Sequence, residues 1–126
     1  MLLKSDLLDI LMAAREGRLD QLDVKWREND AACCVVMASG GYPEEYKTGY
    51  PIGGLPENTP SLFVFHAGTA RKDGRVVTAG GRVLGVTARA PSLGDAIRRA
   101  YEAVAGITFE NAHHRTDIGG NRGSGA

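Results

Sequence analysis

The chain has 126 residues, of which 43% are hydrophobic and 24% charged, and its 15 Lys and Arg residues balance its 15 Asp and Glu residues. This length is typical of one domain with its own core. A net charge of zero provides no broad field to attract nucleic acid or an anionic membrane surface. Because no apolar run approaches the roughly 20 residues of a membrane helix and the first residues lack a signal-peptide pattern, we expect a cytoplasmic protein with no nucleic-acid or membrane partner.

The first element is predicted to be an amphipathic helix over residues 5–16. Its apolar side chains recur at helical spacing, Ser5 or Asp6 is placed to cap its N-terminus, and Gly17 is placed to end it. The run 31–38 contains no charge and is typical of a strand covered on both faces.

Residues 22–27 alternate between apolar and charged side chains, which predicts a strand. We expect this strand to form a hairpin with residues 31–38, since turn-forming residues separate the two runs. The glycine-rich and proline-rich stretch 39–60 predicts a long irregular connection, and long connections in compact domains often border functional sites.

The middle of the chain predicts more strands. Residues 62–66 form an apolar run, and an Asp-Gly turn at 73–74 joins two short segments into the clearest hairpin of the chain. Residues 82–89 have the alternating faces of another strand.

The last clear element is a helix that begins at a cap formed by Ser92 and Asp95 and stops at Gly106. Residues 107–109 are expected to form a short closing strand, and residues 120–126 a flexible tail after a domain spanning 1–119. This order predicts an α+β fold, a twisted, barrel-like antiparallel sheet flanked by two α-helices.

A candidate anion-binding site lies where two loop-to-strand junctions are expected to meet at one edge of the sheet. Glycines there allow backbone N–H groups to approach a ligand, a threonine offers a hydroxyl, and an arginine offers donors suited to phosphate. The candidate residues are His66, Gly68, Thr69, Gly80, Gly81 and Arg82. From the residues alone, the favoured interpretation is that Gly80-Gly81 is a simple turn or bulge and that Arg82 is a solvated charge at the end of a strand.

The cysteines and the remaining histidines offer weaker candidates. Cys33 and Cys34 are adjacent, so we expect reduced thiols, and pairing either with His66, His113 or His114 would give a nucleophile and base only if the fold brought them together. We favour a buried strand cysteine and a solvated segment at the histidine pair. We expect no metal site, because no metal-ligand spacing is present, and no catalytic residue, because no acidic residue is placed to orient a histidine.

Several motifs together resemble one family, the C-terminal domain of glycinamide ribonucleotide synthetases, also called phosphoribosylamine-glycine ligases. The resemblance runs from about Leu3 to Gly119 and rests on five motifs in the same order. They are Leu3-Lys4-Ser5-Asp6-Leu7-Leu8, Val36-Met37-Ala38-Ser39-Gly40-Gly41-Tyr42-Pro43, Val64-Phe65-His66-Ala67-Gly68-Thr69, Gly80-Gly81-Arg82-Val83-Leu84-Gly85-Val86-Thr87, and Arg99-Ala100-Tyr101 before Thr116-Asp117-Ile118-Gly119.

The resemblance implies an ATP-dependent enzyme of purine biosynthesis that joins glycine to phosphoribosylamine through a glycyl phosphate. It implies that this domain works with an N-terminal domain and an ATP-grasp unit, which bind ATP and Mg²⁺ or Mn²⁺, whereas this domain alone binds no cofactor and is inactive. In related purine enzymes a similar strand holds the ribonucleotide phosphate, which implies that role for Arg82. His66, Gly68 and Thr69 fall on a neighbouring motif as lining residues.

Two alternatives remain open from the sequence. The first is a stand-alone, non-catalytic binding or interaction module that retains the fold, with an exposed apolar patch at Leu2, Leu3, Ile52 and Leu55. The second is an independent thiol enzyme, which would require a lowered thiol pKa.

Overall fold

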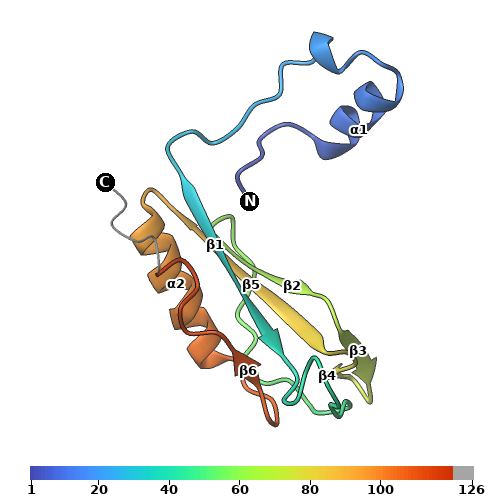
Figure 1. Ribbon diagram of the computed structural model, residues 1–126, viewed down its shortest axis with the longest axis vertical. Helices are drawn as coiled ribbons and strands as arrows, with labels where there is room; N and C mark the ends of the chain where they lie inside the picture. The colour runs from blue at the N-terminus through green and yellow to red at the C-terminus, as the bar shows by residue number, and fades with distance from the viewer. Residues whose placement is uncertain (121–126) are drawn as a thin grey trace.

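A computed structural model describes residues 1–120 of the chain and shows two layers, a helix and a sheet (Figure 1). The elements in chain order are α1 (Leu7–Arg15), a 3₁₀ helix (Leu19–Gln21), β1 (Ala31–Ala38), β2 (Leu62–His66), β3 (Thr69–Lys72), β4 (Arg75–Thr78), β5 (Arg82–Ala90), α2 (Leu93–Gly106) and β6 (His113–His114).

The main sheet has four antiparallel strands in the order β2-β5-β1-β6, and β3 and β4 form a separate hairpin. The predicted turn joins β3 to β4, with positive φ at both Asp73 and Gly74. The predicted α+β class and the antiparallel sheet are confirmed. The sheet remains open at β2 and β6, so its twist does not close into a barrel.

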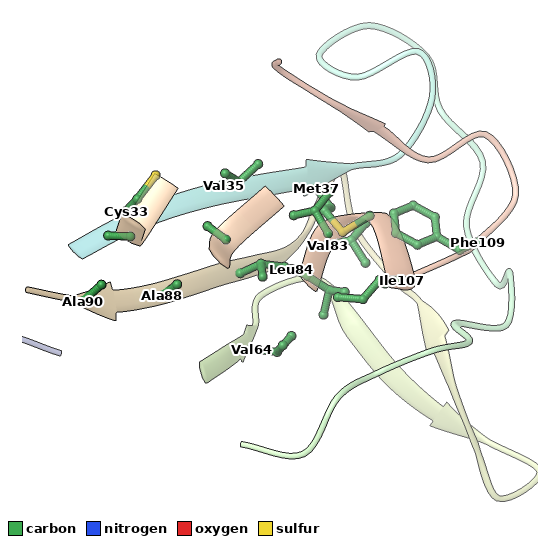
Figure 2. Close-up of a cluster of buried hydrophobic side chains, with 14 residues drawn as sticks. Cys33, Val35, Met37, Val64, Val83, Leu84, Ala88, Ala90, Ile107 and Phe109 are labelled. Atoms are coloured by element: carbon green, nitrogen blue, oxygen red, sulfur yellow. The ribbon is translucent and has the colours of Figure 1, made fainter. Parts of the chain in front are cut away.

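The core lies between α2 and one face of the sheet (Figure 2). Helix α2 turns a stripe of small residues, Ala96, Ala100 and Val104, towards the sheet, as its sequence period predicts. Its N-terminus is capped as predicted, because Ser92 Oγ accepts a hydrogen bond of 3.1 Å from the Asp95 amide. The fully buried side chains that the sheet contributes to this core include Val35, Met37, Val83, Leu84 and Val86.

The other face of the sheet is uncovered among the described residues. Val36 on β1 is 44% exposed and Phe65 on β2 is 47% exposed, and Cys34 on β1 is exposed beside them. The expectation that residues 31–38 are covered on both faces is therefore wrong. Strand β1 is nevertheless internal to the sheet, and its Cys33 and Val35 are buried under α2.

Residues 1–30 form a separate small unit, here called the N-terminal unit, that stands away from the sheet in Figure 1. Helix α1 was predicted and is confirmed, with Asp6 accepting a 2.7 Å hydrogen bond from the Leu8 amide. The predicted hairpin between residues 22–27 and 31–38 is wrong. Trp26 instead pairs with Leu3 in an isolated antiparallel bridge. The alternating pattern of residues 22–27 therefore belongs to a contact within the N-terminal unit.

One further expectation near the C-terminal end is wrong. Residues 107–109 form no strand: Thr108 exchanges two backbone hydrogen bonds with Gly53, of 2.8 and 3.0 Å, in an isolated bridge. The last strand is instead His113–His114, which pairs with the end of β1 as an edge strand and leaves His113 exposed, as expected of a solvated segment. Most of the predicted tail, residues 121–126, lies outside the described residues.

The apolar patch suggested by the sequence also differs. Ile52 and Leu55 pack against the core, and Leu2 and Leu3 are half-buried. Over residues 1–120, neither helix has the length and apolar character needed to cross a bilayer.

Candidate functional site

Three loops meet at the N-terminal end of β5, where Arg82 begins the strand. They are the loop that follows β1, starting at Ser39, the connection 67–68 between β2 and β3, and the connection 79–81 between β4 and β5. The hairpin β3–β4 thus brings the second and third loops together, as the sequence analysis expected for the two glycine-containing junctions.

The glycines of the two junctions allow direct contact between backbones. A Cβ at Gly68 would lie 2.5 Å from the Arg82 carbonyl oxygen and 2.8 Å from the Gly80 Cα. The Gly68 amide donates to the Val83 carbonyl at 3.1 Å, and its carbonyl accepts from the Ala79 amide at 2.8 Å. Gly68 therefore holds the loops together and has no amide left for a ligand.

Ser39 fixes the orientation of the Gly80-Gly81 peptide. Its hydroxyl donates to the Gly80 carbonyl at 2.9 Å and its amide donates to the Gly81 carbonyl at 2.8 Å. Because the N–H of a trans peptide points opposite to its carbonyl, the Gly81 N–H points away from Ser39. Among residues 1–120 this amide donates to no protein acceptor, and Gly81 itself is buried.

The ring of Tyr42 covers Gly81. A Cβ at Gly81 would lie 2.1 Å from Tyr42 Cδ2, so only glycine leaves space for the ring. Tyr46 packs edge-on against Tyr42 with ring centroids 5.9 Å apart. Tyr42 and Ser39 were not among the site residues predicted from the sequence, although both lie in the same motif after β1.

A cavity of about 590 Å³ opens beside Arg82 on the uncovered face of the sheet. Its lining is mainly apolar, with the guanidinium as its cationic group. The lining residues are Val36, Tyr42, Phe65, Ala67, Gly68, Gly81, Arg82, Leu84 and Gly85. This arrangement can hold an anionic group at Arg82 and place a less polar part of the ligand against the aromatic and aliphatic side chains.

The structure separates the six predicted site residues into two groups. Gly68, Gly81 and Arg82 line the cavity, and Gly80 supports them from the adjacent turn. His66 and Thr69 instead contact each other, with Nδ1 and Oγ1 3.0 Å apart, at the base of the β3–β4 hairpin. Within residues 1–120 Arg82 has no ion-pair partner, so its charge is available to a ligand.

Cys33 does not fit the nucleophile of a thiol enzyme. Burial raises the pKa of the Cys33 thiol, and the neighbouring Cys34 raises it further. An activated nucleophile needs a lowered pKa, so the reading as a thiol enzyme receives no support. In the described part of the chain, no group of three or more His, Cys, Asp or Glu side chains is arranged to hold a metal ion.

The fold and the cavity define a class: an α+β domain with one helix-covered sheet face and one open face that carries an arginine at its edge. Comparisons with known proteins then identify the family to which this domain belongs. The family model described as "Phosphoribosylglycinamide synthetase, C domain" matches residues 32–121. The chain belongs to this family, as the resemblance of its motifs implied.

Relatives and a solved structure agree with this assignment. A phosphoribosylamine–glycine ligase of Rhizobium meliloti is 50% identical over 119 residues, covering 94% of this chain and 28% of the relative. The human trifunctional purine biosynthetic protein adenosine-3 is 49% identical over 119 residues, covering 94% of this chain and 12% of that protein. The crystal structure of a Thermotoga maritima phosphoribosylamine–glycine ligase superposes with a TM-score of 0.76 at 35% identity, covering 88% of this chain and 27% of that one. The chain thus spans about a quarter of the length of the two single ligases and 12% of the human protein.

Proposed function

We propose that the chain, through residues 1–119, acts as the C-terminal, substrate-side domain of a phosphoribosylamine–glycine ligase. The complete enzyme would join glycine to 5-phosphoribosylamine with ATP, giving glycinamide ribonucleotide, ADP and phosphate in cytoplasmic purine biosynthesis. Its relatives support this reaction, since each is named as a ligase of this kind or as a multifunctional purine biosynthetic protein.

The observation that carries the substrate role is the unpaired Arg82 at the rim of the cavity. Its guanidinium presents a planar set of donors that fits two oxygens of a phosphate, and we assign it to the phosphate of phosphoribosylamine. Tyr42 and Phe65 line the cavity beside it and offer apolar contacts to the less polar part of the ligand.

His66 and Thr69 take part as a hydrogen-bonded pair that fixes the start of the hairpin next to the site. ATP and Mg²⁺ or Mn²⁺ belong to the other parts of the enzyme in this proposal, because no acidic cluster of the described residues fits the metal. The bound ATP supplies the phosphate that activates glycine. The chain alone is accordingly expected to have no ligase activity.

The test uses a chimeric ligase in which this chain replaces the matching 119 residues of the Rhizobium meliloti enzyme. Arg82→Ala should raise the KM for phosphoribosylamine by about ten- to a hundred-fold, because a charge-assisted hydrogen bond contributes about 1.5–3 kcal/mol. The KM for ATP should stay unchanged. Arg98→Ala is the matched control, since Arg98 lies on α2 at the opposite face and forms only exposed ion pairs. An unchanged KM for phosphoribosylamine in Arg82→Ala would remove Arg82 from the site.

A further inference from the structure

Gly85 lies in the interior of β5, a place where glycine is unfavourable. Strand β5 is paired on both sides, with β2 and with β1. A glycine inside a strand lowers stability, because it loses more conformational freedom on folding than other residues and has no side chain to pack. Where a strand nevertheless contains one, the usual reasons are a bulge, a sharp bend, or the close approach of another backbone or of a ligand.

The local geometry of Gly85 excludes the structural reasons. A Cβ there would lie 3.4 Å from Cys34 Sγ and 3.7 Å from Phe65 Cβ, which are ordinary van der Waals distances. Within residues 1–120 no backbone of another segment lies within 4 Å of that position, and φ is outside the left-handed region. Gly68 and Gly81 differ, since a Cβ at either would lie 2.5 Å or less from its nearest atom. The fold requires those two glycines but accepts a side chain at Gly85.

Gly85 forms a gap in a row of side chains on the uncovered face of the main sheet. Its register partners are Val36 on β1 and Phe65 on β2, and partners in antiparallel strands share a face. Both partners are exposed, and the Phe65 ring packs on Phe63 with ring centroids 4.6 Å apart. All three residues of the row line the cavity beside Arg82. The missing side chain therefore leaves an open floor between two apolar walls.

A β-bulge brings Arg82 to the same face as Gly85. Residues three apart point to opposite faces in a regular strand. The register of β5 against β1 shifts at Val83, so that Ala38 pairs with Arg82. Ala38 and Val36 are two residues apart on β1 and share a face. Arg82 and Gly85 thus belong to neighbouring rows on the uncovered face, about 7 Å apart along β1.

We propose that Gly85 determines which phosphate esters the site accepts, by leaving room for the ribose ring of phosphoribosylamine between Phe65 and Val36. This inference rests on the proposed function, in which Arg82 holds the phosphate. The C–H groups of a five-membered sugar ring fit an apolar floor one row away from the cationic group. A side chain at position 85 would occupy the place of the ring and leave the phosphate contact intact.

The experiment compares two competitive inhibitors of the chimeric ligase, measured against phosphoribosylamine at saturating ATP. Ribose 5-phosphate carries the sugar ring, whereas methyl phosphate carries the phosphate group with a single carbon. Gly85→Val should raise the KM for phosphoribosylamine and the inhibition constant of ribose 5-phosphate by about ten- to a hundred-fold, because the added carbons fill the floor. The inhibition constant of methyl phosphate and the KM for ATP should stay unchanged. Equal rises for both inhibitors, or no rise for ribose 5-phosphate, would overturn the proposal.

Two controls separate loss of room from damage to the fold. The melting temperature of the isolated chain should not fall in Gly85→Val, because the added Cβ meets ordinary contacts and valine favours strands. Ala70→Leu adds the same number of carbons at an exposed position of β3 outside the cavity, and should leave the KM and both inhibition constants unchanged. If Gly85→Val does not fold in the chimera, Gly85→Ala provides the same comparison between the two inhibitors.

Arg82→Ala distinguishes a failure of this inference from a failure of the proposed function. It should weaken ribose 5-phosphate and methyl phosphate alike, because both esters share the phosphate contact. If Arg82→Ala weakens both inhibitors and Gly85→Val weakens neither, the proposed function stands and the role of Gly85 is refuted. Unchanged inhibition by both esters in Arg82→Ala would refute the substrate role on which the inference rests.

Discussion

Gly68 provides a direct test of how the candidate site is built. An alanine Cβ there would lie 2.5 Å from the Arg82 carbonyl oxygen, 2.8 Å from the Gly80 Cα and 3.0 Å from the Gly80 nitrogen. All three atoms belong to the backbone, so no side-chain rotation can relieve the contact. The φ of Gly68 lies outside the left-handed region, so an alanine adds steric overlap without backbone strain.

The cost of Gly68→Ala follows from what must move. Inserting one methyl group into a well-packed place costs about 1–3 kcal/mol. The Gly80 carbonyl is held by Ser39 Oγ at 2.9 Å, so separating the two loops also weakens this hydrogen bond. We therefore expect the free energy of unfolding to fall by about 2–3 kcal/mol and the melting temperature by about 6–12 °C.

Thermal unfolding of the isolated chain, followed by far-ultraviolet circular dichroism, measures this change. Gly94→Ala is the matched control, because a Cβ at Gly94 meets no atom within 4 Å and the position lies in α2. There alanine should stabilise the chain by about 0.5–1 kcal/mol through its higher helix propensity. If Gly68→Ala melted within about 1 °C of the unchanged chain, the close backbone packing at the site would be refuted.

Three further substitutions test a hydrogen bond, an ion pair and a buried thiol elsewhere in the domain. Tyr101→Phe removes the hydroxyl that accepts a 3.0 Å hydrogen bond from the Ile118 amide. The free energy of unfolding measured in urea should fall by about 1 kcal/mol, and an unchanged unfolding midpoint would contradict this prediction. Asp30→Asn weakens the partly buried pair with Arg89 and should cost about 2 kcal/mol in the same assay, whereas a loss under about 0.5 kcal/mol would show that the pair does not hold the N-terminal unit. Burial raises the pKa of Cys33, so above about pH 8.5 the unfolded chain loses this proton first and stability falls as pH rises. Cys33→Ala should reduce that alkaline fall, and an identical pH profile for the variant would contradict the burial effect.

Local sequence patterns correctly predicted the helix ends and the turn, because these features form between residues that are close in the sequence. The cap at Ser92 and the end of α2 at Gly106 were predicted correctly, since the signals for helix ends lie within a few residues of those ends. The Asp73-Gly74 turn was also predicted, because its positive φ angles suit these two residue types. The motifs around Arg82 indicated the family, and the comparisons confirmed it.

The expectations that failed concern pairing between distant segments. Residues 22–27 alternate between apolar and charged side chains, as a strand does. This alternation indicates that one side of the segment is apolar, but it carries no information about which segment pairs with it. In the structure Trp26 pairs with Leu3 and not with β1. His113–His114 has no strand pattern at all and becomes β6 because the chain after α2 returns to the free edge of β1.

The candidate site depends on both kinds of information. The sequence supplied Arg82 and the glycines, because a guanidinium suits phosphate and glycine permits close approach wherever it lies. The tertiary structure decided that Gly68 and Gly80 touch, that Ser39 orients the Gly80-Gly81 peptide, and that Tyr42 covers Gly81. The tertiary structure also decided that one face of α1 and one face of the sheet remain uncovered within residues 1–120. The packing of distant elements around one core determines which apolar surface stays exposed, and no local sequence pattern contains that information.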